Sequence, residues 1–201
     1  MGRTVALELC RCGIHVFIAD VDLAAAGKTV QAAESFTGKA EAHRVDVSNS
    51  SSVQSLFAGL KQRVERLDLL IHAAAILGQT VLIEQMADNE WRRMISVNLD
   101  GAFYCCRETV RWMKQHQSGR IILFSSVAAL TPAPGAVHYS TAKGGVNMMG
   151  KTLAQEVAKH NIRVNMIAPG YIETPILLTN SLSVGRVLQG VIAHEAAHIV
   201  N

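Results

Sequence analysis

The chain has 201 residues, of which 49% are hydrophobic and 17% are charged, and its formal net charge is +3. These values predict one globular domain over residues 1–201, and the lack of a long basic run argues against a nucleic-acid partner. No apolar run is long enough to cross a bilayer and no secretory signal is visible, so we expect a cytoplasmic protein without a membrane partner.

Segments with helical and strand patterns alternate along the chain. The predicted helices span 1–12, 23–33, 52–66, 89–117 and 138–160, and the predicted strands span 14–19, 40–45, 68–71, 119–124 and 162–167. Gly13 is a typical helix C-terminal signal, and an interruption of the fourth helix is expected near Asn98.

Four cysteines occur in two close pairs, Cys10 with Cys12 and Cys105 with Cys106. Each pair lies in a predicted helix, and neither spacing is that of a metal site. We expect these thiols to be buried and reduced, and we predict no metal site in the chain.

Tyr139 and Lys143 lie four residues apart in a predicted helix and therefore on one face, one turn apart. An ammonium close to a phenol favours the phenolate and lowers the phenol pKa from about 10. A Tyr tuned in this way can give a proton to a carbonyl oxygen or take one from a hydroxyl. By itself the pattern is common on ordinary helix faces. Ser125 and Ser126, however, follow the apolar strand 119–124, and open α/β sheets bind ligands at such strand ends.

The order of these motifs carries a family resemblance. Ser126, then Tyr139 and Lys143, then the run 161–170 with sequence NIRVNMIAPG resemble the short-chain dehydrogenase/reductase family over residues 1 to 175. The resemblance implies an α/β fold, a Rossmann-type three-layer α/β/α sandwich with a parallel sheet. It also implies an NAD(P)-dependent oxidoreductase that transfers a hydride between a nicotinamide and a carbinol or carbonyl carbon.

The resemblance assigns roles to four residues. Tyr139 is the general acid or base, and Lys143 lowers its pKa and holds the nicotinamide ribose. Ser126 fixes the substrate oxygen, and Asn98 supports a proton relay through a held water, although Asn98 also suits a simple helix kink. The segment 143–175 is most similar to glucose-type sugar dehydrogenases and 3-oxoacyl reductases, which implies a sugar, polyol or 3-oxoacyl substrate. The small residues of the helix 138–160 let another element pack closely against it, and the resemblance implies that this helix pairs in a homodimer or homotetramer.

Asp20 follows the second strand of the family pattern, near the position of the acidic residue that binds a ribose 2′-hydroxyl. A carboxylate there repels a 2′-phosphate, so we expect NAD rather than NADP. The alternative is a solvated turn with Asp22. The other residues that the resemblance places at the cofactor are Gly2, Asp46, Val47, Ala73, Ala74, Tyr139, Lys143, Pro169, Gly170, Ile172 and Thr174.

Several parts of the chain depart from the family pattern. Residues 72–75 read His-Ala-Ala-Ala where the family has Asn-Asn-Ala-Gly, and we expect His72 to be a strand-end polar residue rather than a catalyst. The first and last strands of the family have no counterpart, and Met1 is expected to be an internal methionine. Because the missing first strand lies centrally in the family sheet, a slot is expected between the strands ending at Ala19 and Ile71 unless they pair directly. A catalytically impaired remnant is therefore an alternative function.

Residues 176–201 form a divergent tail whose apolar spacing predicts a helix. The tail contains His194-Glu195-Ala196-Ala197-His198, which matches the helical zinc-protease pattern. A zinc hydrolase is thus a further alternative. A chance match, with adventitious Zn or Ni binding by the His pair, is the interpretation that the remaining motifs favour.

Overall fold

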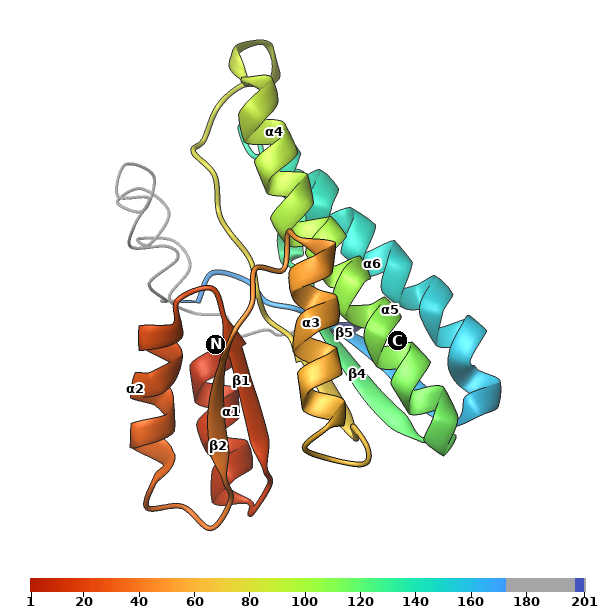
Figure 1. The fold of residues 1–201 in the computed structure, drawn as a ribbon. Coiled ribbons are helices and arrows are strands. Elements are labelled where there is room, and N and C mark those ends of the chain that lie inside the picture. Colours follow the sequence, from red (N-terminus) through yellow and green to blue (C-terminus); the bar gives the residue numbers. More distant parts are fainter. Residues whose placement is uncertain (173–197, 201) are drawn as a thin grey trace. The chain divides into compact units, whose positions relative to one another are not determined.

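The computed structural model describes residues 1–172 and 198–200 and divides the chain into two compact units, Met1–Glu65 and Arg66–Asn201 (Figure 1). Each unit has its own parallel strands and its own helices. The expectation that they form a single domain stays a prediction.

The first unit contains a two-stranded parallel sheet. Its elements are α1 (Gly2–Arg11), β1 (Val16–Asp20), α2 (Leu23–Ala33), β2 (Ala40–Arg44) and α3 (Ser50–Lys61). In the pairing of β1 with β2, Val16 lies opposite Ala40 and Asp20 lies opposite Arg44. Figure 1 shows α2 running beside this pair of strands.

Local chemistry explains where these helices begin and end. Gly13 follows α1 with φ +79°, a left-handed conformation that glycine adopts without strain, so the predicted stop signal is confirmed. The Asp22 carboxylate accepts a hydrogen bond from the Ala25 N–H at 3.0 Å and caps α2. The Asn49 side chain accepts from the Ser52 N–H at 3.0 Å and caps α3 in the same way.

The second unit contains a four-stranded sheet in the order β3-β4-β5-β6. Strands β3 (Leu69–His72), β4 (Gly119–Phe124) and β5 (Ile162–Ala168) are parallel, and β6 (His198–Val200) pairs antiparallel to β5. The main helices are α4 (Asp88–Ile95), α5 (Gly101–His116) and α6 (Val137–Val157). Short 3₁₀ turns occupy Ile83–Gln85, Val127–Ala129 and Ala158–His160.

The core of the second unit lies between its sheet and the helices α5 and α6, which run along it in Figure 1. Ile121, Leu123 and Met166 from the strands are fully or almost fully buried there. Gly150 on α6 lets this helix approach closely, because a Cβ at this position would collide with Met166. Burying these side chains contributes roughly 1.5–3 kcal/mol each relative to exposure.

The predicted interruption of the fourth helix is confirmed as a π-helical turn over Ser96–Asp100, between α4 and α5. Such turns insert one residue into the helical ladder and recur at functional sites. Asn98 lies within this turn and is fully buried.

Three expectations need correction or comment. Cys12 is exposed, not buried, whereas Cys10, Cys105 and Cys106 are buried, and all four thiols are free. Burial raises the pKa of both Cys105 and Cys106 to about 12, so these two thiols are protonated. Within the predicted helical tail, His198–Val200 forms a strand rather than a helix; residues 173–197 and 201 lie outside the described residues.

The described strands form two sheets, one in each unit. In these sheets β1 pairs with β2 and β3 pairs with β4, and the slot expected between the strands ending at Ala19 and Ile71 stays a prediction. In the described part of the chain, no helix is both long enough and apolar enough to cross a membrane.

Candidate functional site

The predicted catalytic residues of the second unit meet at the carboxyl edge of its parallel strands. Ser126 lies two residues beyond β4, and Tyr139 and Lys143 lie in the first two turns of α6. Asn98, in the π-helical turn, bonds to the segment that follows β3. This edge is where parallel α/β sheets bind ligands, so the structure brings together the four side chains that the sequence indicated.

Tyr139 is hydrogen-bonded to Ser126 through the two side-chain oxygens. The Ser126 Oγ also accepts a hydrogen bond from the Ala128 N–H at 3.2 Å, which fixes its position at the start of the turn after β4. Burial raises the pKa of the Tyr139 phenol, and the bond to Ser126 acts in the opposite direction. The phenol is therefore protonated at neutral pH.

This direction corrects the expectation that Lys143 lowers the pKa of Tyr139. The Lys143 Nζ lies 6.0 Å from the centre of the Tyr139 ring and donates a hydrogen bond to the Phe124 carbonyl at 2.7 Å. The ammonium is thus directed to the end of β4 rather than to the phenolic oxygen, and burial of the phenol has the larger effect.

Lys143 is almost fully buried, with 2% of its surface exposed. Burial lowers the pKa of its ammonium to about 8, because charge is disfavoured away from water. The Ser125 hydroxyl donates to the Lys143 carbonyl at 3.1 Å, which ties the start of α6 to the end of β4. A lysine tuned in this range can change its charge near neutral pH.

Asn98 has a positioning role that the sequence did not indicate. Its Oδ1 accepts from the Ile76 N–H at 2.8 Å, and its Nδ2 donates to the Ile76 carbonyl at 2.9 Å. Both amide groups are therefore bonded to the backbone that follows β3. The amide fastens this segment to the π-helical turn, and the predicted role of Asn98 in a proton relay stays a prediction.

Other predicted cofactor residues lie at the same edge of the second unit. Ala73 and Ala74 follow β3 and are half-buried, and Pro169 and Gly170 follow β5. The Val127 N–H donates to the Pro169 carbonyl at 3.0 Å, so the loops after β4 and β5 are joined. Ile172 is exposed, and Thr174 lies outside the described residues.

The predicted residues of the first unit also gather at one end. Asp20 ends β1, and Asp46 and Val47 follow the parallel strand β2. Because α1 runs into β1 through a tight turn, its first residue Gly2 lies at this same end. The Asp20 Oδ1 accepts a hydrogen bond from the Asp22 N–H at 2.9 Å. Asp20 therefore does form the turn with Asp22 that was expected as its alternative role. The carboxylate is nevertheless exposed to solvent and available to a ligand.

Each unit offers groups that suit part of a dinucleotide. In the first unit, α1 begins with backbone N–H groups that have no intrahelical partner, and Met1 provides no side-chain cap. Asp20 supplies a carboxylate that can accept from a ribose diol. In the second unit, the buried ammonium of Lys143 retains donors beyond its bond to Phe124. The residues present therefore fit the two ends of such a cofactor, each within its own unit.

Two buried histidines lie near these residues: His138, which sequence reasoning missed, and His72, which was expected to be a strand-end polar residue and does end β3. His138 precedes Tyr139, is 1% exposed, and has no hydrogen-bond partner for either ring nitrogen among the described residues. Its ring packs so closely on Gly78 that a side chain at that position would collide with it. Burial lowers the pKa of His138, and the Glu90 carboxylate partly offsets this effect. His72, at the end of β3, is likewise buried. Neither histidine belongs to a periodic pattern that marks it from sequence.

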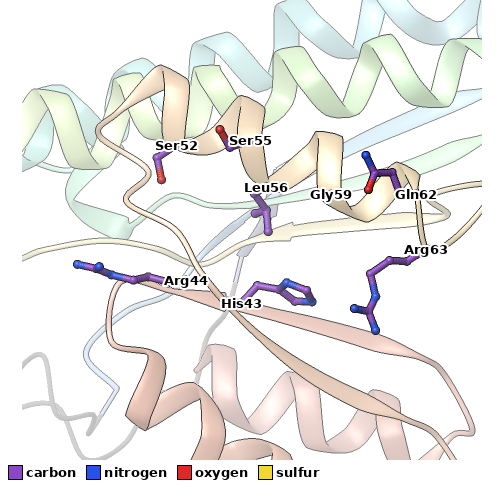
Figure 2. Close-up of a pocket in the computed structure, with 8 residues that line it drawn as sticks. All are labelled: His43, Arg44, Ser52, Ser55, Leu56, Gly59, Gln62 and Arg63. Atoms are coloured by element: carbon purple, nitrogen blue, oxygen red, sulfur yellow. The ribbon is translucent and has the colours of Figure 1, made fainter.

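A separate cleft of about 660 Å³ lies in the first unit between β2 and α3 (Figure 2). Figure 2 shows its lining side chains, His43, Arg44, Ser52, Ser55, Leu56, Gln62 and Arg63, with Gly59. The Arg63 guanidinium is paired with Glu41, whose other oxygen accepts from His15 at 2.9 Å. The cleft contains none of the predicted catalytic or cofactor residues.

The zinc-protease pattern of the tail is not assembled in the described part of the chain. His194 and Glu195 lie outside the described residues, and His198 begins strand β6. Among residues 1–172 and 198–200, no three His, Cys, Asp or Glu side chains are grouped to hold a metal.

Comparison with known proteins identifies the family. The family model described as short chain dehydrogenase matches residues 1–182. The chain belongs to the short-chain dehydrogenase family. This family consists of oxidoreductases with a Rossmann-type fold. The family membership expected from the motifs is therefore confirmed.

Two relatives illustrate the range of the family. The chain is 33% identical over 184 residues to a 3β-hydroxysteroid dehydrogenase of Mediterraneibacter gnavus, covering 92% of this chain and 66% of that protein. It is 32% identical over 176 residues to a 3-oxoacyl-(acyl-carrier-protein) reductase of Thermotoga maritima, covering 88% of this chain and 71% of that protein. The chain thus spans about two thirds of the length of these relatives.

Solved structures agree with this assignment. An NAD⁺-bound xylitol dehydrogenase superposes with a TM-score of 0.84 at 26% identity, covering 88% of this chain and 68% of that one. A metagenomic short-chain oxidoreductase in complex with NADP gives a TM-score of 0.81 at 27% identity, covering 85% and 77%. The family thus includes proteins bound to either cofactor, and the choice for this chain depends on its own residues.

Proposed function

We propose that this chain carries the catalytic machinery of an NAD-dependent reductase, in which Tyr139 donates a proton to a carbonyl oxygen while a hydride reaches the carbonyl carbon. One observation carries the proposal: Tyr139 is hydrogen-bonded to Ser126 at the carboxyl edge of the parallel strands, and its burial keeps the phenol protonated. A protonated phenol suits the donor role that reduction requires.

The residues divide the work of this reaction. Ser126 orients the carbonyl oxygen, and Tyr139 releases its proton to that oxygen as negative charge develops. The Lys143 ammonium donates a hydrogen bond to the Phe124 carbonyl and lies 6.0 Å from the centre of the Tyr139 ring. Its other N–H groups can donate to a ribose. The nicotinamide cofactor supplies the hydride when it is bound.

The preference for NAD rests on Asp20. This exposed carboxylate at the end of β1 can accept from both hydroxyls of a ribose and would repel a 2′-phosphate. Arg44 lies opposite Asp20 in the strand register and is the cation that would favour NADP. Because the carboxylate is nearer the expected ribose position in the family pattern, we take Asp20 as the determinant.

The substrate that we propose is a small alcohol or carbonyl compound of the sugar, polyol or 3-oxoacyl type. Support comes from the relatives, since 3-oxoacyl-(acyl-carrier-protein) reductases and a xylitol dehydrogenase are among the similar proteins. The protonated state of Tyr139 favours the reductive direction, which suits a 3-oxoacyl substrate best.

We further propose that two or four copies of the chain associate through α5 and α6. Phe103 on α5 and Met148 on α6 are large apolar side chains that are 46% and 63% exposed. A second copy is the occupant that the family resemblance implies. Sedimentation equilibrium of the wild type and of Met148→Lys tests this: a wild-type monomer would contradict the proposal.

A second candidate is a catalytically impaired remnant, and one observation favours it. The described strands form two separate sheets, and the groups proposed for the two ends of the cofactor lie in different sheets, each within its own unit. Calorimetric titration of the 201-residue chain with NADH distinguishes the candidates. Micromolar binding supports the reductase; no binding at millimolar NADH supports the remnant.

A further inference from the structure

His72 is a buried imidazole directed to the same side of the sheet as α6. It is the last residue of β3 and lies in register with Leu123 of β4, which in turn lies in register with Met166 of β5. Residues in register on parallel strands point to the same face. Leu123 and Met166 both contact the position of Gly150 on α6, so the His72 side chain lies on the α6 face.

The Lys143 ammonium occupies the same side of the sheet at the neighbouring strand end. It bonds to the carbonyl of Phe124, the residue after Leu123, and Leu123 is the strand partner of His72. The charge on Lys143 acts on the imidazole: burial first, and then this charge, lowers the pKa of His72 to about 4. His72 is therefore neutral at pH 7 and faces a cation.

The imidazole has an unmet bonding requirement. Its Nε2 is buried and has no hydrogen-bond partner among the described residues. A buried polar atom without a partner destabilises the fold, and ordered water usually satisfies such atoms. The Lys143 ammonium has further donors, because it carries three N–H groups and the Phe124 carbonyl accepts from one of them.

We propose that the His72 Nε2 accepts a hydrogen bond from a buried water that also accepts one from the Lys143 ammonium, and that His72 thereby is a positioning residue for Lys143. The inference rests on the proposed function for the role of Lys143, but the contact itself does not. A neutral imidazole is suited to this task, since it adds an acceptor near the cation without adding charge.

Polar and titratable groups of α6 and of the turn after β4 lie beside Lys143. On α6, Tyr139 lies one turn before Lys143. In the turn after β4, the Ser125 hydroxyl bonds to the Lys143 carbonyl and the Ser126 side chain bonds to Tyr139. From β3 no charged residue lies beyond His72 itself, since Leu69–His72 is otherwise apolar. Loss of the imidazole acceptor is therefore expected to act mainly on Lys143.

The test is the pKa of Lys143 itself, read by NMR on ¹³C-lysine-labelled protein without cofactor, with the Lys143 signal assigned from Lys143→Met. In His72→Leu the ammonium loses its bridged acceptor, so the Lys143 pKa should fall by about one unit. His72→Gln places an amide near the former Nε2 and should restore the wild-type titration. Thr109→Val, which removes another buried hydroxyl without a partner in the described part of α5, is the matched control and should change nothing.

The outcomes separate this inference from the proposed function. An unchanged Lys143 pKa in His72→Leu, or an equal fall in His72→Gln, would overturn the role of His72 even in an active enzyme. A shift confined to the Leu variant would uphold it even if the chain proves inactive. His72→Met serves in place of the Leu variant if that protein does not fold, as judged by circular dichroism.

Discussion

Asn98 and Ile76, 22 positions apart, are joined by two hydrogen bonds that occupy both ends of the Asn98 amide. The pair fastens the segment after β3 to the π-helical turn between α4 and α5. Because Asn98 is fully buried, removing the amide leaves the Ile76 N–H and carbonyl without these partners away from bulk solvent.

Asn98→Ala should therefore lower the free energy of unfolding by about 2 to 4 kcal/mol, the effect of two lost bonds and two unpaired backbone groups. Urea denaturation measures this change. Asn147→Ala is the matched control, since Asn147 is also buried but its Oδ1 has no partner in the described residues. An equal loss of unfolding free energy in the two variants would show that the Asn98–Ile76 hydrogen bonds do not stabilise the fold beyond the effect of truncating a buried Asn.

The buried His72 predicts a pH dependence of stability. Its pKa is about 4 in the folded chain and about 6.5 when unfolded, so the unfolded state takes up the proton first on acidification. The stability contribution is complete above pH 6.5, is lost as the pH falls from 6.5 to about 4, and amounts to about 3 kcal/mol.

Denaturant unfolding at pH 7 and pH 4.5 measures this loss. His72→Gln cannot take up the proton and should show a smaller loss than the wild type, while His138 continues to titrate in both proteins. Identical pH dependence in wild type and variant would be evidence against a neutral, buried His72.

The cofactor preference should depend on Asp20. Asp20→Asn removes the negative charge near the expected 2′-position and should raise the kcat/KM for NADPH relative to NADH by roughly tenfold or more, about 1.4 kcal/mol. Asp22→Asn is the matched control, because Asn preserves the cap of α2 and removes a charge two residues away. Should both variants shift the ratio equally, the effect is one of general charge and not of Asp20.

Much of the local structure was predictable from sequence. The helix Leu23–Ala33 and the strand Gly119–Phe124 have the bounds that their patterns indicated, since capping residues and apolar runs act locally. The order of Ser126, Tyr139 and Lys143 likewise sufficed to indicate the site. These features depend on neighbours in the chain or on fixed spacing along a helix.

Other features depend on contacts that no local pattern encodes. The bond between Asn98 and Ile76, and the packing of His138 on Gly78, join residues far apart in sequence. The pKa of Tyr139 is raised rather than lowered because burial and the direction of the Lys143 ammonium decide it. Cys12 directly follows α1 and is two residues from the buried Cys10, a spacing that points the two side chains to opposite sides of a helix.

The raised pKa of Tyr139 predicts opposite pH profiles for the two directions of the reaction. Reduction needs the protonated phenol, so its rate should be level through neutral pH and fall above the Tyr139 pKa. Oxidation needs the phenolate and should rise with pH over the same range. Ser126→Ala removes the bond that lowers this pKa and should move both limbs to higher pH. A profile that moves to lower pH would contradict the Ser126–Tyr139 bond.

The proton-donor role of Tyr139 is tested most directly by single-turnover reduction of a 3-oxoacyl substrate with Tyr139→Phe, at saturating NADH. The variant removes one oxygen and should fold as the wild type does. Its rate should fall by about a hundred- to ten-thousand-fold, the usual contribution of a positioned general acid. Tyr104→Phe, on α5, should keep the wild-type rate. A Tyr139→Phe variant that retains most of the wild-type rate would contradict the assignment of Tyr139 as the proton donor.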